Sequence, residues 1–287
     1  MIENALEVRN LTKDYGDFVL DKLSFTLPRG VIMGLIGENG AGKSTTINCI
    51  LNELQKNGGE ISVFGKDHLD FETEVKNEIG VIFDDSALPD LFTAIELGRV
   101  FKNIYENWDG HAFRSYLEKF NLPLQKPIGE FSRGMKVKLN FALALSHNAH
   151  LLILDEATSG LDPIMRDEIL DILLDYVQDE NNSVLFSSHI TSDLERIADY
   201  ITFIHKGKIL FSMANDELLE NYGIIHCGAA VFDTLDKSKI VAYRKQDFEW
   251  QVLVTDRDQL AKQLKNCIVD KATIDDIMLF HVKGERK

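Results

Sequence analysis

The chain has 287 residues and a formal net charge of −15, from 46 acidic and 31 basic side chains. A chain this acidic is a poor candidate for coating nucleic acid or an anionic membrane by itself. The three cysteines, Cys49, Cys227 and Cys267, are far apart and odd in number. They indicate neither a disulfide framework nor a zinc site, and they fit a reducing compartment.

The sequence also shows no sign of a membrane-inserted segment. Its N-terminus, Met-Ile-Glu-Asn, lacks the basic and apolar regions of a signal peptide. No apolar stretch approaches the roughly 18 residues needed to span a bilayer. We therefore expect an intracellular chain, and any membrane part of its function would have to come from another subunit.

A glycine-rich loop follows three predicted strands, at residues 5–9, 18–27 and 31–36. Its sequence is Gly37-Glu-Asn-Gly-Ala-Gly-Lys43-Ser44-Thr45. Glycines let successive backbone N–H groups curl around a phosphate chain, and the helix expected at residues 44–53 aims its positive end at the same anion. Strand, loop and helix in this order predict nucleoside triphosphate binding, with Lys43 between the outer phosphates and Ser44 on Mg²⁺. The residues expected to hold the nucleotide are Gly37, Asn39, Gly40, Ala41, Gly42, Lys43, Ser44 and Thr45.

The next predicted elements alternate between strand and helix. Strands are expected near residues 60–64 and 79–83, and again at 151–154, 183–186 and 200–204. A helical block fills residues 87–147, with helices at about 87–122 and 135–146. Asp162-Pro163 indicates an N-cap with proline at the first helical position, and Ser192-x-x-Glu195 indicates a capping box. The alternation predicts an α/β fold with a largely parallel sheet.

The pattern changes after Tyr222-Gly223. Strands are expected at residues 225–232, 240–243 and 250–254. A helix at 256–265 is expected to begin with a Thr255-x-x-Asp258 capping box, and a last helix, ending near His281, with a Thr273-x-x-Asp276 box. We predict a domain at residues 1–222 and a small α+β accessory domain at residues 223–287.

Two carboxylates, Asp155 and Glu156, stand at the end of the apolar strand 151–154. Asp155 is placed to hold Mg²⁺ through its water shell, as an acidic residue does after a strand of many P-loop ATPases. Glu156 is placed to orient and activate the attacking water. The alternative interpretation is a buried strand that simply ends in polar residues without a catalytic role.

Several sequence blocks follow one another in a fixed order along the chain. They are Tyr15, Gly37–Thr45, Phe131-Ser132-Arg133-Gly134-Met135, Asp155-Glu156, Ser159-Gly160-Leu161-Asp162 and Ser188-His189. In this order the blocks resemble the ATP-binding-cassette (ABC) ATPases, the motor subunits of ABC transporters, and the resemblance spans about residues 5–222. It implies a P-loop NTPase fold of the ABC type, with a mostly parallel core sheet, N-terminal antiparallel strands and a helical subdomain. It also implies an ATPase that uses ATP and Mg²⁺.

The resemblance assigns roles to matching residues. Tyr15 resembles the aromatic residue that stacks on adenine, with a core tyrosine as the alternative. Ser132 and Gly134 resemble the signature element that binds the γ-phosphate held by the opposite subunit, with a simple N-cap as the alternative. Asp162 resembles the loop that crosses to the partner's site. His189 resembles the switch histidine that hydrogen-bonds the γ-phosphate, with a structural histidine as the alternative, and it joins Glu156 and Lys43 as the expected catalytic residues.

The same resemblance implies partners. Because the family's signature acts in trans, hydrolysis implies a head-to-tail dimer of ATPase domains, either a homodimer or a heterodimer. A transmembrane permease is the expected partner, which places the chain on the cytoplasmic, inner face of the cell membrane. Nucleic acid is not an expected partner.

Two positions depart from the family's pattern. Asp84 stands where the family usually has a glutamine, and its carboxylate is a candidate Mg²⁺ ligand because Mg²⁺ favours oxygen. Arg133-Gly134-Met135 replaces Gly-Gly-Gln in the signature. Both changes bear on the rate of hydrolysis more than on its occurrence.

Two further blocks, Phe83-Asp-Asp-Ser86 and Tyr105-Glu-Asn-Trp108-Asp109, are similar to a branch of bacterial exporters for amphipathic and antimicrobial peptides. We therefore expect the motor subunit of an exporter. One alternative is a soluble ABC-type ATPase acting on ribosomes or DNA. Another is a nucleotide-gated regulator with weak turnover, against which the retained Glu156 and His189 argue.

Overall fold

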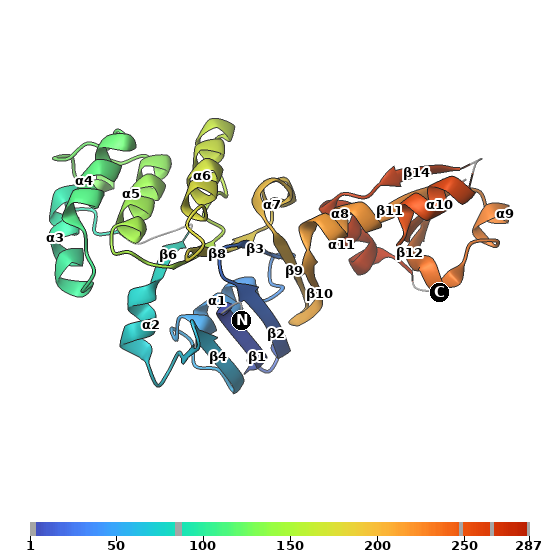
Figure 1. Cartoon of the computed structure of the whole chain (residues 1–287), viewed down its shortest axis with the longest axis horizontal. Coiled ribbons are helices and arrows are strands. Elements are labelled where there is room, and N and C mark those ends of the chain that lie inside the picture. Colours follow the sequence, from blue (N-terminus) through green and yellow to red (C-terminus); the bar gives the residue numbers. More distant parts are fainter. Residues whose placement is uncertain (1–3, 84–87, 247–248, 265–266, 286–287) are drawn as a thin grey trace.

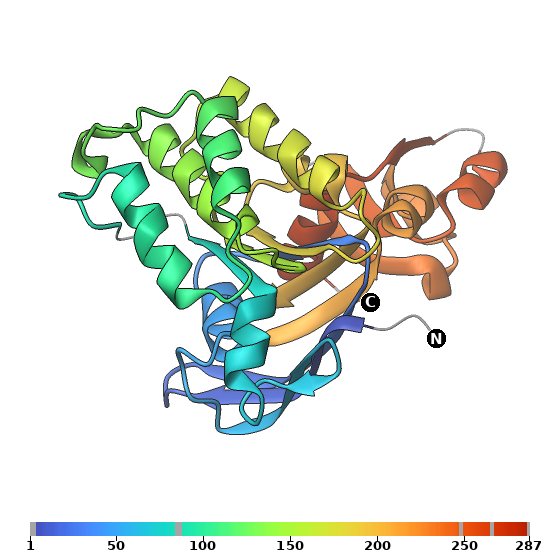
Figure 2. The same ribbon diagram turned by 60° about the vertical axis from the view of Figure 1, so that its left-hand side comes forward.

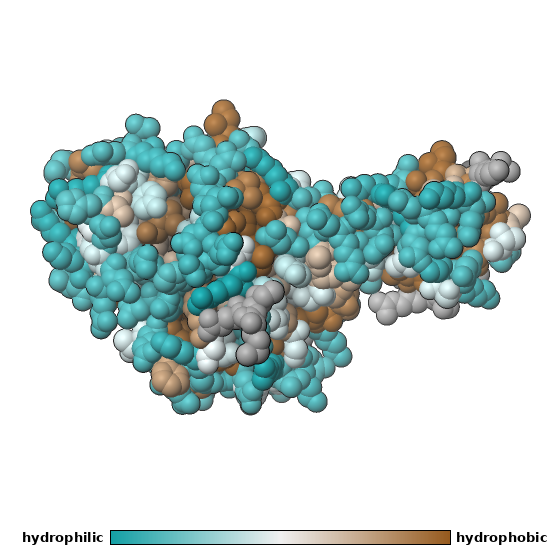
Figure 3. Space-filling view, in the orientation of Figure 1, coloured by the Kyte–Doolittle hydropathy of each residue, from teal (hydrophilic) through white to brown (hydrophobic). Residues whose placement is uncertain are grey.

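The computed structural model describes residues 4–83, 88–246, 249–264 and 267–285. Figure 1 shows two lobes arranged along the long axis, with the second lobe formed by the C-terminal part of the chain. The surface seen in Figure 3 is mostly hydrophilic over both lobes. Within the described ranges, no helix combines the length and the apolar character that crossing a membrane requires.

A mixed sheet lies at the centre of the first lobe, with the strand order β10-β9-β3-β8-β7-β6. The strands from β9 to β6 are parallel, and β10 pairs antiparallel with β9. Every residue of β3, β7 and β8 is buried, as expected for parallel strands covered on both faces. The strands are β3 (Ile32–Ile36), β6 (Ile79–Phe83), β7 (Leu151–Asp155), β8 (Ser183–Ser188), β9 (Tyr200–His205) and β10 (Lys208–Ala214).

A second, antiparallel sheet covers one face of the central sheet, with the order β2-β1-β4-β5. Its apolar face shares one core with the central sheet and with helix α1 (Lys43–Ile50). The strands are β1 (Asn4–Asp14), β2 (Val19–Pro28), β4 (Gly58–Val63) and β5 (Lys66–Asp67). The expected parallel core with N-terminal antiparallel strands is therefore confirmed.

Helices cover the opposite face of the central sheet, as Figure 2 shows. The predicted helical block separates into shorter elements, because the capping box of Thr93 and the N-caps of Asp109 and Ser132 each start a new helix. The helices of this lobe are α2 (Glu72–Glu78), α3 (Ala94–Ile104), α4 (Gly110–Lys119), the 3₁₀ turn η1 (Ile128–Glu130), α5 (Arg133–Leu145), α6 (Pro163–Tyr176) and α7 (Thr191–Ile197).

The second lobe is built on an antiparallel sheet with the order β12-β13-β11-β14. Its face towards α9 and α10 has an apolar core of its own. The elements are α8 (Asn215–Asn221), β11 (Gly223–Cys227), α9 (Ala229–Phe232), η2 (Lys237–Lys239), β12 (Ile240–Lys245), β13 (Trp250–Val254), α10 (Arg257–Gln263), β14 (Ile268–Lys271) and α11 (Ile274–Lys283).

Several local predictions are corrected. The helix expected at residues 44–53 ends at Ile50, because the chain turns through Asn52 at positive φ. The strand expected at 225–232 ends at Cys227, and α9 follows it. By contrast, the N-cap at Asp162 and the capping box at Thr273 are confirmed.

Two predicted capping boxes are wrong, because each helix begins at a different residue from the one expected. Ser192 lies inside α7, whose N-cap is Ile190, and Glu195 instead accepts a hydrogen bond from the Ile274 N–H at 2.7 Å. At α10 the N-cap is Asp256 in a left-handed conformation, and its carboxylate pairs with Lys239.

The two lobes share one apolar core at their junction. Leu194 and Ile197 of α7 belong to the same buried cluster as Ile277 and Phe280 of α11. The Glu195 carboxylate, which accepts the first N–H of α11, adds a polar contact at the same place. The packing of the first lobe therefore continues into the second without a break.

We expect Phe280→Ala to lower the free energy of unfolding by about 3–5 kcal/mol, because a fully buried phenylalanine leaves a cavity when it is truncated. Phe280 is 2% exposed, whereas Phe71, the matched control, is 46% exposed. Chemical denaturation of both variants measures the difference, and Phe71→Ala is expected to cost less than about 1 kcal/mol. Equal losses in the two variants would contradict the shared core.

Candidate active site

The phosphate loop lies between the end of β3 and the start of α1, at the carboxyl edge of the central sheet. Two of its glycines are required by the local geometry. Gly42 is the N-cap of α1 with φ at 116°, and a Cβ there would lie 2.5 Å from Cδ2 of Leu20. A Cβ on Gly37 would lie 2.4 Å from the carbonyl oxygen of Ile204. Bare backbone at both places lets the loop curl at the helix N-terminus, where anions bind.

An open cavity of about 650 Å³ lies over this loop. It brings together six of the eight predicted residues of the phosphate loop with two predicted catalytic residues, Glu156 and His189, which follow other strands. Gly37 and Ala41 belong to the loop but do not line the cavity, and Ala41 is buried beneath it. The lining residues are Phe18, Asn39, Gly40, Gly42, Lys43, Ser44, Thr45, Glu156, Ser159 and His189.

Lys43 is held at the base of the cavity by the loop itself. Its Nζ donates to the carbonyl oxygens of Gly37 at 2.8 Å and Glu38 at 3.4 Å. The same ammonium lies 3.1 Å from Oε1 of Glu156. Because the Lys43 side chain is almost fully buried, its charge is directed at the cavity and is poorly screened by solvent.

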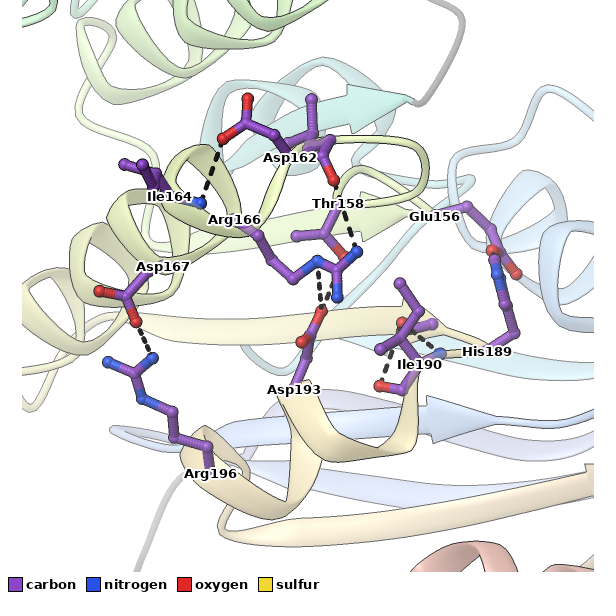
Figure 4. A network of polar contacts seen from close by, with 12 residues as sticks. Glu156, Thr158, Asp162, Ile164, Arg166, Asp167, His189, Ile190, Asp193 and Arg196 are labelled. Atoms are coloured by element: carbon purple, nitrogen blue, oxygen red, sulfur yellow. Dashed lines mark hydrogen bonds and ion pairs between the residues drawn. The ribbon is translucent and has the colours of Figure 1, made fainter.

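Glu156 and His189 lie side by side at the cavity, just after the ends of neighbouring strands β7 and β8 (Figure 4). The Nδ1 of His189 contacts Oε2 of Glu156. Glu156 has a left-handed backbone with φ at 55°, an uncommon conformation for a residue with a Cβ. Its N–H donates to the carbonyl oxygen of Ser187 at 3.0 Å, which holds the turn. Strained backbone at such a position is typical of functional sites.

The predicted metal ligands Asp155 and Ser44 lie beside the phosphate loop. Asp155 is buried at the end of β7, and its Oδ1 has no hydrogen-bond partner among the described residues. Ser44 is exposed, so its hydroxyl is free to bind. A carboxylate oxygen and a hydroxyl form a donor set that suits Mg²⁺. Asp84, the third predicted ligand, lies outside the described residues.

Tyr15 lies in the turn between β1 and β2, so the alternative of a core tyrosine is wrong. Its side chain is 53% exposed, and Lys13 Nζ lies 5.2 Å from the centre of its ring. It does not line the cavity over the loop, whereas Phe18, from the other side of the same turn, does. The sequence reasoning missed Phe18, although its place just before an apolar strand near the loop was the available signal.

Ser132, Gly134 and Asp162 do not line the cavity. Ser132 is the N-cap of α5, accepting a hydrogen bond from the Met135 N–H at 3.3 Å. A Cβ on Gly134 would lie 2.9 Å from Cε of Met165, whose N–H in turn donates to the Asp162 carboxylate. The first turn of α5 therefore lies against the first turn of α6, which puts these predicted residues together but outside the lining of the cavity.

A buried polar network behind the cavity was not predicted. Asp193 on α7 accepts a hydrogen bond from Thr158 at 3.1 Å, and Arg166 on α6 lies 3.8 Å from the same carboxylate oxygen (Figure 4). Burial raises the pKa of Asp193, while the Thr158 hydroxyl and the Arg166 charge oppose that rise. The network ties the loop after Glu156 to the helix after His189.

Comparison with known proteins agrees with this geometry. The family model described as ABC transporter matches residues 20–159. The bacitracin transport ATP-binding protein BcrA of Bacillus licheniformis is 33% identical over 86% of this chain and 81% of its own length. The chain belongs to the ATP-binding subunits of ABC transporters.

Other members of the family support the same conclusion. The lantibiotic transport ATP-binding protein SrtF of Streptococcus pyogenes is 33% identical over 74% of this chain and 91% of its own length. A solved ATP-binding subunit of an ABC transporter superposes with a TM-score of 0.67 and 28% identity, over 75% of this chain and 91% of the other.

This ABC subunit therefore binds ATP and hydrolyses it as the motor subunit of a transporter, which confirms the predicted family, fold class and enzyme class. The cited relatives are all transport proteins, so the alternative of a soluble ATPase acting on ribosomes or DNA is not favoured.

Proposed function

We propose that this ABC subunit drives an exporter of amphipathic or antimicrobial peptides from the cytoplasmic face of the cell membrane. The names of two relatives, which transport bacitracin and a lantibiotic, support this substrate class. The proposal divides the chain into an ATPase domain at residues 1–222, with a helical subdomain at about 87–147, and an accessory domain at residues 223–287.

The observation that carries the proposal is the convergence of Lys43, Glu156 and His189 at one cavity. Lys43 binds the outer phosphates of ATP as a fixed cation. Glu156 accepts a proton from the attacking water, whose orientation the left-handed turn at this residue fixes. His189, held by the same carboxylate, donates a hydrogen bond towards the γ-phosphate. Positioning and charge stabilisation of this kind account for most of the catalysis in phosphoryl transfer.

Ser44 and Asp155 hold Mg²⁺ in this proposal, with Asp84 as a further ligand. The unpartnered, buried Oδ1 of Asp155 supports this assignment, because an uncompensated buried carboxylate oxygen is costly. When bound, the ion neutralises charge on the outer phosphates. Tyr15 and Phe18, which flank the turn beside the loop, are the proposed contacts of the adenine ring.

A second ATPase subunit completes the site. Ser132, Gly134 and Asp162 lie together at the N-terminal ends of α5 and α6, outside the lining of the cavity over their own phosphate loop. Exposed N–H groups at a helix start bind an anion presented from outside. We therefore assign these residues to the γ-phosphate of the ATP bound by the partner in a head-to-tail dimer. The partner is a second copy or a related subunit.

The permease docks on the helical subdomain in this account. Leu91, which lies shortly before α3, is 90% exposed, and Ile104 at the end of α3 is also exposed. Isolated exposed apolar residues are common, but these two flank one helix, α3, which follows β6 in the chain. That position suits a contact that transmits movement of the ATPase domain.

We expect Leu91→Asp to weaken permease binding at least about tenfold, because a charge would replace an apolar contact at the proposed interface. Leu69→Asp is the matched control, since Leu69 is also exposed but lies beside β5. Co-purification of each variant with the membrane subunit measures the effect. Normal recovery of the Leu91→Asp complex would contradict this docking site.

The substrate proposal has its own test. The subunit and its permease, reconstituted in vesicles with ATP, are expected to move a labelled cyclic or lanthionine-containing peptide across the membrane. A Glu156→Gln complex is the control for transport that does not depend on hydrolysis. ATP hydrolysis without movement of any such peptide would refute the substrate class and leave the motor function standing.

A further inference from the structure

Two cysteines of the second lobe meet at the end of a strand pair. In the antiparallel pairing of β11 with β14, Ile225 lies opposite Val269 and His226 lies opposite Ile268. Continued by one position, this register would place Cys267, just before β14, opposite Cys227, the last residue of β11. Residues directly opposite each other in an antiparallel pair have Cα atoms about 4.5–5.5 Å apart, and a disulfide needs a Cα separation of about 4.4–6.8 Å.

Both side chains belong to the same face of the sheet. Cys227 is part of the buried core of the second lobe, and Cys267 packs against that core. Both are free thiols. The N–H of Cys267 donates to the carbonyl oxygen of Leu264 at 3.2 Å, which holds the residue at the end of the ladder as the chain leaves α10.

The two sulfurs also interact electrostatically and differ in accessibility. Burial, then the nearby Cys267 and Glu249, raises the pKa of the Cys227 thiol to about 11. Cys227 is therefore protonated at neutral pH, and the thiolate is the reactive form of cysteine. Cys267 is only partly buried and is the thiol that a reagent in solution reaches first.

We propose that Cys227 and Cys267 form a redox-active dithiol that closes to a cross-strand disulfide by exchange with a small-molecule disulfide. Neither the family nor the motor function assigns a role to these residues. Reversible disulfides of this kind in reducing compartments are usually redox-sensing or catalytic.

The exchange takes place in two balanced steps. The Cys267 thiolate attacks one sulfur of the small-molecule disulfide, forms a mixed disulfide and expels one thiolate. The Cys227 sulfur, losing its proton, then attacks the Cys267 sulfur and expels the second thiolate. The two departing thiolates take up the two protons released by the cysteines. The protein dithiol is oxidised by two electrons, and the small-molecule disulfide is reduced to two thiols.

The bond would close the end of the ladder that lies farther from the first lobe. β11 follows α8 at Gly223, and β14 leads into α11 after Lys271, and these two residues pair with each other at the opposite end of the ladder. Oxidation would thus link the two strands at their far end without touching the phosphate loop.

The test treats the full-length protein with glutathione disulfide, alkylates the remaining thiols after denaturation and identifies the products by peptide mass spectrometry. Wild type is expected to lose both thiols and yield a peptide pair joined through Cys227 and Cys267. Cys49, which is buried on α1 and far in sequence from the other two cysteines, is the internal control. It is expected to remain a free thiol during oxidation and therefore to be alkylated after denaturation.

Two variants separate the steps. Cys227→Ser is expected to stop at a mixed disulfide on Cys267, and Cys267→Ser is expected to leave Cys227 as a free thiol. A wild type that keeps a mixed disulfide on Cys267 beside a free Cys227 would overturn the proposal, as would two thiols that survive an excess of oxidant. Neither result would bear on ATP hydrolysis at the other lobe.

Discussion

Glu156→Gln is expected to lower the rate of ATP hydrolysis by about 10³-fold while leaving ATP binding intact, because the amide keeps the shape of the side chain but cannot accept the proton of the attacking water. Lys43 and His189, which contact the two carboxylate oxygens, would remain in place around an uncharged group. Phosphate release at saturating Mg-ATP measures the rate, and binding of a fluorescent ATP analogue measures the affinity.

The control for this variant is Glu118→Gln, which makes the same change on the exposed surface of α4. It is expected to retain the rate of the wild type. A Glu156→Gln variant that keeps more than about a tenth of the activity would mean that another group serves as the base.

Gly134→Asp is expected to abolish ATP-driven dimerisation and to reduce hydrolysis by at least about 10²-fold, because it places a carboxylate where the partner's γ-phosphate should bind. The substituted side chain meets only the flexible end of Met165, so the first lobe is expected to fold. Light scattering with Mg-ATP, in the Glu156→Gln background that preserves bound ATP, measures the dimer directly.

Gly110→Asp is the matched control, since it puts the same charge in the first turn of α4. A Cβ at Gly110 lies 3.7 Å from its nearest neighbour, so the change fits without strain. Dimerisation is expected to persist in this variant. If Gly134→Asp also dimerises normally with ATP, the signature residues do not form part of a shared site.

The fold class and many of the candidate site residues could be predicted from motifs of residues that are close together in the sequence. The phosphate loop, the Asp155-Glu156 pair and the caps at Ser132 and Asp162 all act through neighbours close in sequence, so their spacing alone predicts them.

Features that depend on packing between distant segments were missed. Thr158, Arg166 and Asp193 come from three elements, and nothing in the local pattern pairs them. The sequence predicted that Glu195 belongs to a capping box on its own helix, whereas in the structure its carboxylate accepts a hydrogen bond from the first N–H of α11. Cys227 and Cys267 are 40 positions apart in the chain, and only the pairing of β11 with β14 brings their parts of the chain together.

The most direct test of the central account is to mix the Glu156→Gln and Gly134→Asp variants, each of which is expected to be inactive alone. If each site combines the phosphate loop of one subunit with the signature of the other, every mixed dimer contains one intact site. An equal mixture should then recover activity that neither variant shows alone. For random pairing this is about a quarter of the activity of the wild type, because half of the random pairs are mixed and each has one of two sites intact. Activity no higher than that of the separate variants would contradict a site shared between two subunits.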